Sequence, residues 1–315
     1  MPKIMTLGEI LVEFLAETKD QSFAKAGNFI GPYPGGSPVI FIDQIGKLGS
    51  PCGIIGCVGR DDFGRLVIDH LKNDGVDANF INIVPDNTTG SAFVSRKTDG
   101  SRDFIYYLTN TASGQLDPEM VTSEALSDCD ILHITGTSLF SPKLINATRK
   151  AIEIIKANGK KISFDPNLRK EMLDIPGLWG ALIEIMQQAD LLLPSEGELN
   201  LLLGCDDQRQ SVEKAFTTGR NLKEIIVKQG KNGCQYYGRK GNSLHVPGFS
   251  VEEVDSTGAG DCFAAAYLHF HHALMDTEQA LKYANAAGAY AVTKQGPMEG
   301  NTTLQELDNL ITRKA

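Results

Sequence analysis

The chain of 315 residues is predicted to fold as a single α/β domain, residues 1–315, with a mostly parallel central sheet. Beyond Asp117-Pro118, short apolar strands alternate with longer helical segments, which is the order of a parallel sheet covered by helices on both faces. Before that point, segments 11–35 and 90–112 alternate apolar and polar residues instead, which predicts small antiparallel strands outside the main sheet.

The first part of the chain contains signals for two strand–helix units. Ile4–Leu7 is expected to be the first strand. A helix to about Leu48 should follow the first β-rich segment, with Ser37 as its N-cap and Pro38 at the first helical position. Ile54–Val58 predicts another buried strand, and Gly75 should close the helix after it. In the second β-rich segment, Asp99-Gly100 predicts the turn of a hairpin.

The remainder of the chain supplies the other elements of the sheet. Apolar runs predict strands at Ile131–Ile134, Lys161–Phe164, Leu191–Leu193 and Glu224–Lys228. Helices are expected at Lys143–Asn158, Leu178–Gln188, Glu196–Leu203 and Ser211–Gly219. Because ligands of such sheets bind beyond the carboxyl ends of the strands, polar motifs that follow strands should meet at one edge. These motifs are Gly35-Gly36, Asp165, Ser195 and Gly230.

Composition excludes several functional classes. The 30 Lys and Arg residues are outnumbered by 39 Asp and Glu residues, which gives a net charge of -9 and argues against general affinity for nucleic acids. The six cysteines are scattered without Cys-x-x-Cys spacing, as expected for small buried side chains in a reducing compartment. No signal peptide and no apolar run of about 18 residues is present, so we expect a soluble, cytoplasmic protein without membrane contact.

The stretch Asp255-Ser256-Thr257-Gly258-Ala259-Gly260-Asp261 is the strongest functional signal. It lies between residues 249–254, which alternate as in a strand, and an alanine-rich run that predicts a buried helix. Small residues at a helix N-terminus let backbone N–H groups approach an anion such as phosphate. Asp261 would repel that phosphate, so we interpret it as a proton acceptor for an attacking hydroxyl. The alternative is a simple N-cap.

This stretch resembles the C-terminal signature of the ribokinase-type (PfkB) family of carbohydrate kinases, and Gly35-Gly36-Ser37-Pro38 resembles the family's N-terminal signature. Motifs between them match in order, so the resemblance covers essentially the whole chain. It implies a ribokinase-like three-layer sandwich in which segments 11–35 and 90–112 form a β lid over the sugar. It also implies that Gly258, Ala259 and Gly260 form an anion hole and that Asp261 is the catalytic base.

The resemblance also implies a binding site for ATP and Mg²⁺. Ser195-Glu196-Gly197-Glu198 occupies the place of the family's Asn-x-x-Glu motif, with Ser195 where asparagine is usual. Glu198 would bind Mg²⁺ through water. The alternative, an acidic first helical turn that complements the helix dipole, applies more to Glu196 than to Glu198. Asp255, Thr257 and the backbone of Gly296 would form a monovalent cation site, for K⁺. The residues expected at the nucleotide are Ser195, Lys228, Gly230, Gly233, Thr257, Gly258, Gly260, Asn285 and Gly288.

The same resemblance assigns the sugar side of the pocket. The expected contacts, besides Asp261, are Glu13, Gly35, Gly36, Tyr106 and Arg169. Arg169 ends the motif Asp165-Pro166-Asn167-Leu168-Arg169 and could hold the sugar or, as a catalytic residue, screen the charge of the phosphate. Glu13 could instead be a solvent-facing strand residue, and Arg169 a surface residue after an Asp-Pro turn. Two positions depart from the family pattern. Ile40 stands where a sugar-binding asparagine is expected, and Leu108 where many relatives carry an arginine that binds the carboxylate of a keto-acid sugar.

We therefore predict an ATP-dependent kinase that phosphorylates a hydroxyl of a small carbohydrate, with a ketohexose such as fructose or tagatose as the first choice. 2-Keto-3-deoxygluconate is the alternative, followed by ribose or a nucleoside. A non-catalytic sugar or nucleotide sensor is the alternative from another class. A dinucleotide-dependent oxidoreductase is disfavoured, because Gly8-Glu9-Ile10 does not provide the Gly-x-Gly-x-x-Gly pattern after the first strand. The resemblance also implies that two lids can pair in a homodimer.

Overall fold

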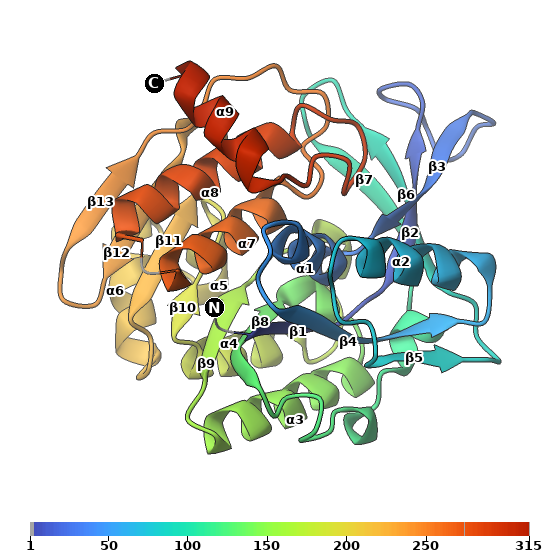
Figure 1. Ribbon diagram of the computed structural model, residues 1–315, viewed down its shortest axis with the longest axis horizontal. Helices are drawn as coiled ribbons and strands as arrows, with labels where there is room; N and C mark the ends of the chain where they lie inside the picture. The colour runs from blue at the N-terminus through green and yellow to red at the C-terminus, as the bar shows by residue number, and fades with distance from the viewer. Residues whose placement is uncertain (1–2, 274, 315) are drawn as a thin grey trace.

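The computed structural model describes residues 3–273 and 275–314 (Figure 1). Its large sheet has the strand order β13-β12-β11-β10-β9-β8-β1-β4-β5. All neighbouring strands are parallel except at β12, which runs antiparallel to both of its neighbours. The strands are β1 (Lys3–Leu7), β4 (Cys52–Gly59), β5 (Ile81–Val84), β8 (Cys129–Thr135), β9 (Lys161–Asp165), β10 (Leu191–Leu192), β11 (Glu224–Lys228), β12 (Cys234–Gly238) and β13 (Ser243–Val246).

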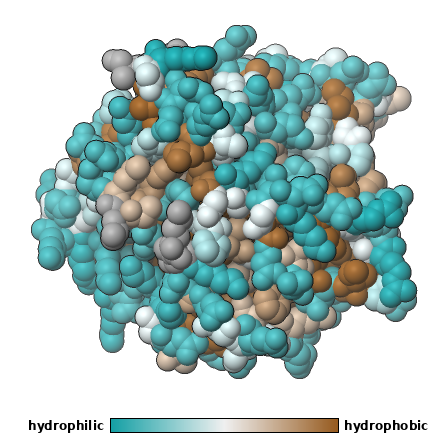
Figure 2. Space-filling view, viewed as in Figure 1, coloured by the Kyte–Doolittle hydropathy of each residue, from teal (hydrophilic) through white to brown (hydrophobic). Residues whose placement is uncertain are grey.

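Helices cover both faces of this sheet, which confirms the predicted three-layer architecture (Figure 1). Each face has its own apolar core. One is covered by α1 (Ser37–Lys47), α2 (Asp62–Asn73), α7 (Ala259–His272), α8 (Thr277–Ala291) and α9 (Leu304–Lys314). The other is covered by α3 (Pro142–Ala157), α4 (Leu178–Gln188), α5 (Glu198–Leu203) and α6 (Gln208–Thr218). The face of the molecule drawn in Figure 2 is mostly hydrophilic, as expected when apolar side chains fill the cores.

A second, four-stranded sheet stands apart from the main sheet at one end of the molecule (Figure 1). Its order is β3-β2-β6-β7, with antiparallel pairs β2–β3 and β6–β7 and a parallel pair β2–β6 between them. The two predicted β-rich segments therefore combine into one small sheet. Its strands are β2 (Leu11–Ala16), β3 (Phe29–Gly35), β6 (Gly90–Arg96) and β7 (Arg102–Tyr107).

Two local predictions were wrong. Residues 249–254 form no strand; this segment is an irregular connection in which the N–H groups of Val254 and Asp255 both donate to the carbonyl of Val292. Ser37 is not the N-cap of α1, because Gly36 occupies that position with φ 101° and Ser37 is already helical. The hydroxyl of Ser37 is thereby directed elsewhere. The short strands β5, β12 and β13 were not predicted.

Five short 3₁₀ turns connect the main elements in the described residues: Ala112–Gln115, Pro118–Met120, Gly136–Ser138, Lys170–Met172 and Gly230–Asn232. Across residues 3–273 and 275–314, no helix combines the length and apolar character needed to cross a membrane.

Candidate active site

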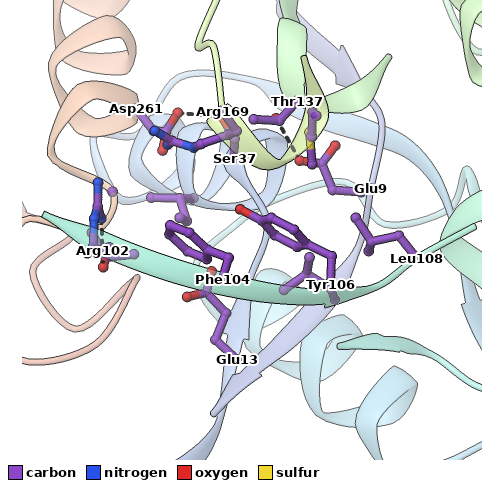
Figure 3. Close-up of a pocket in the computed structure, with 16 residues that line it drawn as sticks. Glu9, Glu13, Ser37, Arg102, Phe104, Tyr106, Leu108, Thr137, Arg169 and Asp261 are labelled. Atoms are coloured by element: carbon purple, nitrogen blue, oxygen red, sulfur yellow. Dashed lines mark hydrogen bonds between the residues drawn. The ribbon is translucent and has the colours of Figure 1, made fainter. Parts of the chain in front are cut away.

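A pocket lies between the small sheet and the carboxyl edge of the large sheet, against the N-termini of α1 and α7 (Figure 3). Side chains from β2 and β7 form one wall, and residues of α1, α7 and the loop after β9 form the opposite wall. The lining residues are Glu9, Leu11, Glu13, Gly36, Ser37, Ile40, Arg102, Phe104, Tyr106, Leu108, Thr137, Arg169, Met172, Thr257, Gly258 and Asp261.

The N-terminus of α7 is open toward this pocket. Gly258 is its N-cap, with φ 78°, and supplies no side chain to bond the first helical amides. A Cβ at Gly258 would lie 2.5 Å from the carbonyl oxygen of Pro297, so only glycine fits there. Unpaired amides and the positive end of the helix dipole favour an anion at this point. Asp261 is the third residue of α7 and is therefore not its N-cap.

The carboxylate of Asp261 is buried at the base of the pocket (Figure 3). Its Oδ1 accepts a hydrogen bond from Ser37 Oγ at 2.5 Å and a longer one from Asn167 Nδ2 at 3.4 Å. Asn167 Nδ2 also donates to Ser37 Oγ at 2.8 Å, which fixes this hydroxyl between the two residues. Among the residues that the structure describes, none donates a hydrogen bond to Asp261 Oδ2. That oxygen is free for a substrate hydroxyl.

The pKa of Asp261 is raised to about 6. Burial is the main cause, and the neighbouring charge of Asp165 adds to it. The hydrogen bond from Ser37 and the charges of Lys228 and Arg169 act in the opposite direction. A carboxylate with this pKa is still deprotonated at pH 7 and accepts a proton more readily than an ordinary aspartate does.

Lys228, at the end of β11, brings a positive charge to the same point. Its ammonium donates a short hydrogen bond to Asp165, at the end of β9. A Cβ at Gly260 would lie 3.3 Å from Lys228 Nζ, so the ammonium lies beside the open N-terminus of α7. Two independent sources of positive potential, an ammonium and a helix N-terminus, therefore face the same small space.

Glu198 begins α5 close to this ammonium. Its carboxylate accepts hydrogen bonds at 2.7 Å from the backbone N–H groups of Ser195 and of Leu168. Burial raises its pKa, and the charge of Asp165 raises it further. A divalent cation would relieve the repulsion between these two acids, so the residues present fit a Mg²⁺ ion that keeps waters and phosphate oxygens as its other ligands.

Glu13 on β2 forms the far wall of the pocket. Only 5% of Glu13 is exposed, which rules out the solvent-facing alternative. One of its oxygens, Oε2, is buried without a hydrogen-bond partner, and burial raises the pKa of Glu13 to about 7. Gly35 lies against it, because a Cβ there would be 2.7 Å from Glu13 Oε1. A buried acceptor without a donor is unusual in a folded protein and suits a ligand that supplies one.

The aromatic side chains of β7 complete the lid wall. Phe104 and Tyr106 stack with ring centroids 5.2 Å apart, and both line the pocket (Figure 3). The guanidinium carbons of Arg102 and Arg169 lie 5.7 and 5.9 Å from the Phe104 centroid. Arg169 therefore belongs to the pocket and is not a surface residue after a turn. Ile40 and Leu108, at the two positions that depart from the family pattern, also line it.

Asp255, Thr257 and Gly296 are brought together beside the pocket. Asp255 Oδ1 accepts from the backbone N–H of Thr257 at 3.0 Å and from its hydroxyl at 2.8 Å, and Asp255 Oδ2 accepts from Gly296 N–H at 3.2 Å. Arg102 reaches across from the lid and donates to Thr257 Oγ1 at 2.9 Å. The lid thus contacts the glycine-rich segment directly.

The remaining predicted nucleotide residues lie on the side of α7 away from the lid. Ser195 pairs with Lys228, and Gly230 and Gly233 both adopt positive φ in the turn after β11. Gly288 on α8 packs against α7, where a Cβ would lie 3.2 Å from the carbonyl oxygen of Ala259. The side chain of Asn285 donates to the carbonyl oxygens of Val246 and Pro247, and so holds the segment after β13 rather than projecting freely.

Sequence reasoning missed several pocket residues. Glu9, directly after β1, accepts hydrogen bonds from Thr137 Oγ1 at 2.8 Å and Ser138 Oγ at 2.6 Å, and burial raises its pKa to about 7. Arg102 was missed because its role depends on where the lid folds. Ser37 and Asn167 both belong to motifs that follow predicted strands, but the sequence does not show that their side chains meet at Asp261. One histidine of α7, His269, is buried, and its Nδ1 forms a hydrogen bond with Ser50 Oγ, which indicates a packing role.

Comparison with known proteins decides the family. The pfkB family carbohydrate kinase model matches residues 1–304. The chain belongs to this family. As a family member it is a phosphotransferase that acts on a sugar hydroxyl, which leaves neither the oxidoreductase nor the sensor alternative favoured. The predicted ribokinase-like fold is confirmed as well.

Relatives of this pfkB kinase have known names and structures. It is 32% identical to fructokinase-1 from Zea mays, over 98% of each chain. A putative ribokinase II from E. coli, in complex with ATP and Mg²⁺, is 47% identical with a TM-score of 0.93 and covers 99% of this chain and 100% of its own. A fructokinase from Xylella fastidiosa with bound ATP is 26% identical with a TM-score of 0.86, over 99% of this chain and 98% of its own.

Proposed function

We propose that this pfkB kinase is a ketohexose kinase of the fructokinase type, which transfers the γ-phosphoryl group of ATP to a hydroxyl of fructose or a closely related sugar. One observation carries the proposal: the buried carboxylate of Asp261 lies at the base of a pocket whose opposite wall holds the unpartnered oxygen of Glu13. A polyhydroxy ligand between them supplies a proton to the first and a hydrogen bond to the second.

The charges of the pocket support a neutral sugar over a keto-acid sugar. Three carboxyl groups line it, on Glu9, Glu13 and Asp261, against two guanidinium groups, on Arg102 and Arg169. A substrate carboxylate would add a fourth acid to this space. Leu108 also provides no positive charge where many relatives carry one. The curated relative from Zea mays is named a fructokinase, which supports the same choice.

In the proposed reaction, Asp261 accepts the proton of the attacking hydroxyl as its oxygen bonds to the γ-phosphorus and the bond to the ADP oxygen breaks. Ser37 and Asn167 hold Asp261 so that Oδ2 faces the substrate. The amides of Gly258, Ala259 and Gly260 stabilise charge on the transferring group, with Lys228 and Arg169 beside them. The aromatic wall of β7 excludes water and so limits hydrolysis of ATP.

The nucleotide is proposed to lie along Ser195, Lys228, Gly230, Gly233, Thr257, Asn285 and Gly288. Glu198 would hold Mg²⁺ through water, and the ion would neutralise phosphate charge when bound. Asp255, Thr257 and Gly296 would hold K⁺. This proposal rests on the hydrogen bonds that bring the three residues together. The guanidinium of Arg102 donates to Thr257 Oγ1 at the same place. Equal rates of sugar-dependent ADP release in K⁺ buffer and in tetramethylammonium buffer would contradict the K⁺ proposal.

The proposal is tested by ADP release from Mg·ATP with fructose, tagatose, 2-keto-3-deoxygluconate, ribose and adenosine in parallel. We expect the highest kcat/KM with a ketohexose. A preference for 2-keto-3-deoxygluconate would show that Arg102 and Arg169 replace the missing arginine at Leu108. A preference for ribose would instead align the chain with its E. coli relative and overturn the ketohexose assignment.

Replacing Glu13 by glutamine is expected to raise KM for the sugar about tenfold or more, because a hydrogen bond to a charged group contributes about 1.5–3 kcal/mol. KM for ATP should stay unchanged. Steady-state kinetics with each substrate varied in turn measure both constants. Glu17→Gln is the matched control, since Glu17 is exposed just beyond the same strand. An unchanged sugar KM in Glu13→Gln would remove Glu13 from the sugar site.

Replacing Ser37 by alanine is expected to move the acidic limb of the kcat/KM–pH profile to higher pH. The reaction requires deprotonated Asp261, so the rate of the native enzyme should fall as pH drops through about 6. The hydrogen bond from Ser37 favours the charged carboxylate, and its loss raises the pKa of Asp261 further. Ser211→Ala, which removes another buried, bonded hydroxyl on α6, should leave the profile unchanged. A coincident profile for both variants would contradict this role of Ser37.

The lid supports pairing with a second copy of the chain. Along β7, Phe104 and Tyr106 face the pocket, while the alternate residues Ile105 and Tyr107 are exposed, as is Ile30 on β3. We expect a dimer in sedimentation velocity and a monomer after Tyr107→Glu. A monomeric native protein would contradict the pairing.

A cytoplasmic location is also proposed, supported by the six unpaired cysteines, five of them buried.

A further inference from the structure

A second cluster of polar side chains lies outside the pocket, where the C-terminal ends of α1 and α2 meet. Asp43 and Lys47 lie one turn apart on α1, and His70 and Asp74 lie one turn apart at the end of α2. The two helices approach closely at Gly46, where a Cβ would collide with the carbonyl oxygen of Asp74. The phosphoryl-transfer reaction uses none of these side chains.

The distances within this cluster suit a metal ion. His70 Nε2 lies 3.5 Å from Asp43 Oδ1 and 3.4 Å from Asp74 Oδ2, and all three ligand atoms lie within 4.8 Å of one another. Ligands held at about 2.0–2.2 Å in a tetrahedral zinc site are about 3.3–3.6 Å apart. The two measured separations that involve His70 fall within this range.

The hydrogen bonding of the cluster is incomplete, which points to a ligand. Asp43 is fully buried, and its Oδ1 has no hydrogen-bond partner; nor has His70 Nε2, which faces it. The other oxygen of Asp43 accepts from Asn301 Nδ2 at 2.6 Å, so the carboxylate is fixed with Oδ1 toward His70. A buried carboxylate oxygen left unpartnered is costly, and a bound cation would satisfy it.

The charge of the cluster favours a cation. Two carboxylates are opposed by a single ammonium, that of Lys47, whose Nζ lies 3.5 Å from Asp74 Oδ2. The neutral imidazole of a histidine is a common ligand of such ions. The C-terminal ends of two helices add negative potential. The side chains of His70 and Asp74 are 31% and 22% exposed, so an ion can enter from solvent.

We propose that Asp43, His70 and Asp74 bind a divalent transition-metal ion of the zinc class, which clamps α1 to α2 remote from the sugar pocket. One imidazole and two carboxylates form a ligand set used by zinc, and the imidazole disfavours Mg²⁺, which prefers oxygen ligands and keeps several waters. Water completes the coordination. The site is independent of the proposed sugar specificity.

The test is a titration of the EDTA-treated, full-length protein with ZnCl₂ in competition with a chromophoric chelator, without nucleotide. We expect about one ion per chain, and visible absorption of a tetrahedral centre when Co²⁺ replaces Zn²⁺. His70→Gln and Asp74→Asn should each weaken binding at least about tenfold, the range found for loss of groups that merely support a ligand. His245→Gln, at an exposed histidine on β13, should bind as the native protein does.

A further readout, the midpoint of thermal unfolding, does not depend on the variants' kinase activity. Zn²⁺ should raise the midpoint of thermal unfolding of the native protein and of His245→Gln, but not of His70→Gln. Absence of binding, or equal Zn²⁺ affinity in the native protein and His70→Gln, would overturn the proposal; in that case a proton held by Asp43 satisfies the cluster.

Discussion

The Asp261→Asn variant is expected to lose about 10²–10⁴-fold or more of kcat, because an amide cannot accept the proton of the attacking hydroxyl. The asparagine side chain has nearly the same shape and can still accept the hydrogen bond from Ser37 Oγ. Binding of ATP should therefore be retained. Stopped-assay ADP release gives the rate, and equilibrium binding of a fluorescent ATP analogue gives the affinity.

Asp207→Asn is the control for this variant, because Asp207 caps α6 away from the pocket. It should keep the native rate. An Asp261→Asn enzyme with near-native kcat would remove Asp261 from the role of base. If Asp261→Asn lost ATP binding as well as activity, the result would instead indicate a structural role for the charge of Asp261.

Replacing Gly258 by alanine is expected to lower kcat about 100-fold or more and to lower the free energy of unfolding. Gly258 has φ 78°, a conformation that costs an alanine about 1–2 kcal/mol. The added Cβ would also lie 2.5 Å from Pro297 O and 2.9 Å from Ile40 Cγ2, so the N-terminus of α7 must move. A displacement of about 1 Å at a catalytic group can cost about 100-fold in rate.

Gly159→Ala separates the backbone cost from the collision. Gly159 follows α3 with φ 66°, and a Cβ there would meet nothing within 4 Å. The Gly159→Ala variant should lose a similar amount of unfolding free energy, because its backbone cost is similar, but it should keep its kinase activity. Unfolding in urea and initial rates measure both effects. Equal activity of the two variants would contradict the tight fit required at Gly258.

Much of the fold could be predicted because strand and helix signals are local. The helix Leu178–Gln188 and the strand Glu224–Lys228 were predicted with the bounds observed, since apolar spacing defines both. Residues 249–254 also alternate, yet none of the strands in residues 3–273 and 275–314 pairs with them. Alternation in the sequence shows only which side chains are apolar. A strand also requires a neighbouring strand to hydrogen-bond with, and only the tertiary structure provides it.

The candidate site was predictable only in part, for the same reason. Asp261 and its glycines form a contiguous motif, so their proximity is set by the chain itself. The bond from Arg102 to Thr257 joins residues 155 positions apart and depends on how the lid folds over the sheet. Ser37 was assigned to a cap because serine often caps helices; Gly36 took that place and left the hydroxyl for Asp261.

This kinase is expected to transfer phosphate to a sugar and not to water. This expectation is tested most directly by ³¹P NMR of the native enzyme with Mg·ATP and fructose. We predict that the resonance of a sugar phosphate ester grows in step with that of β-ADP, with little inorganic phosphate. ADP accompanied by an equal amount of inorganic phosphate, or no reaction with any sugar of the panel, would contradict the account.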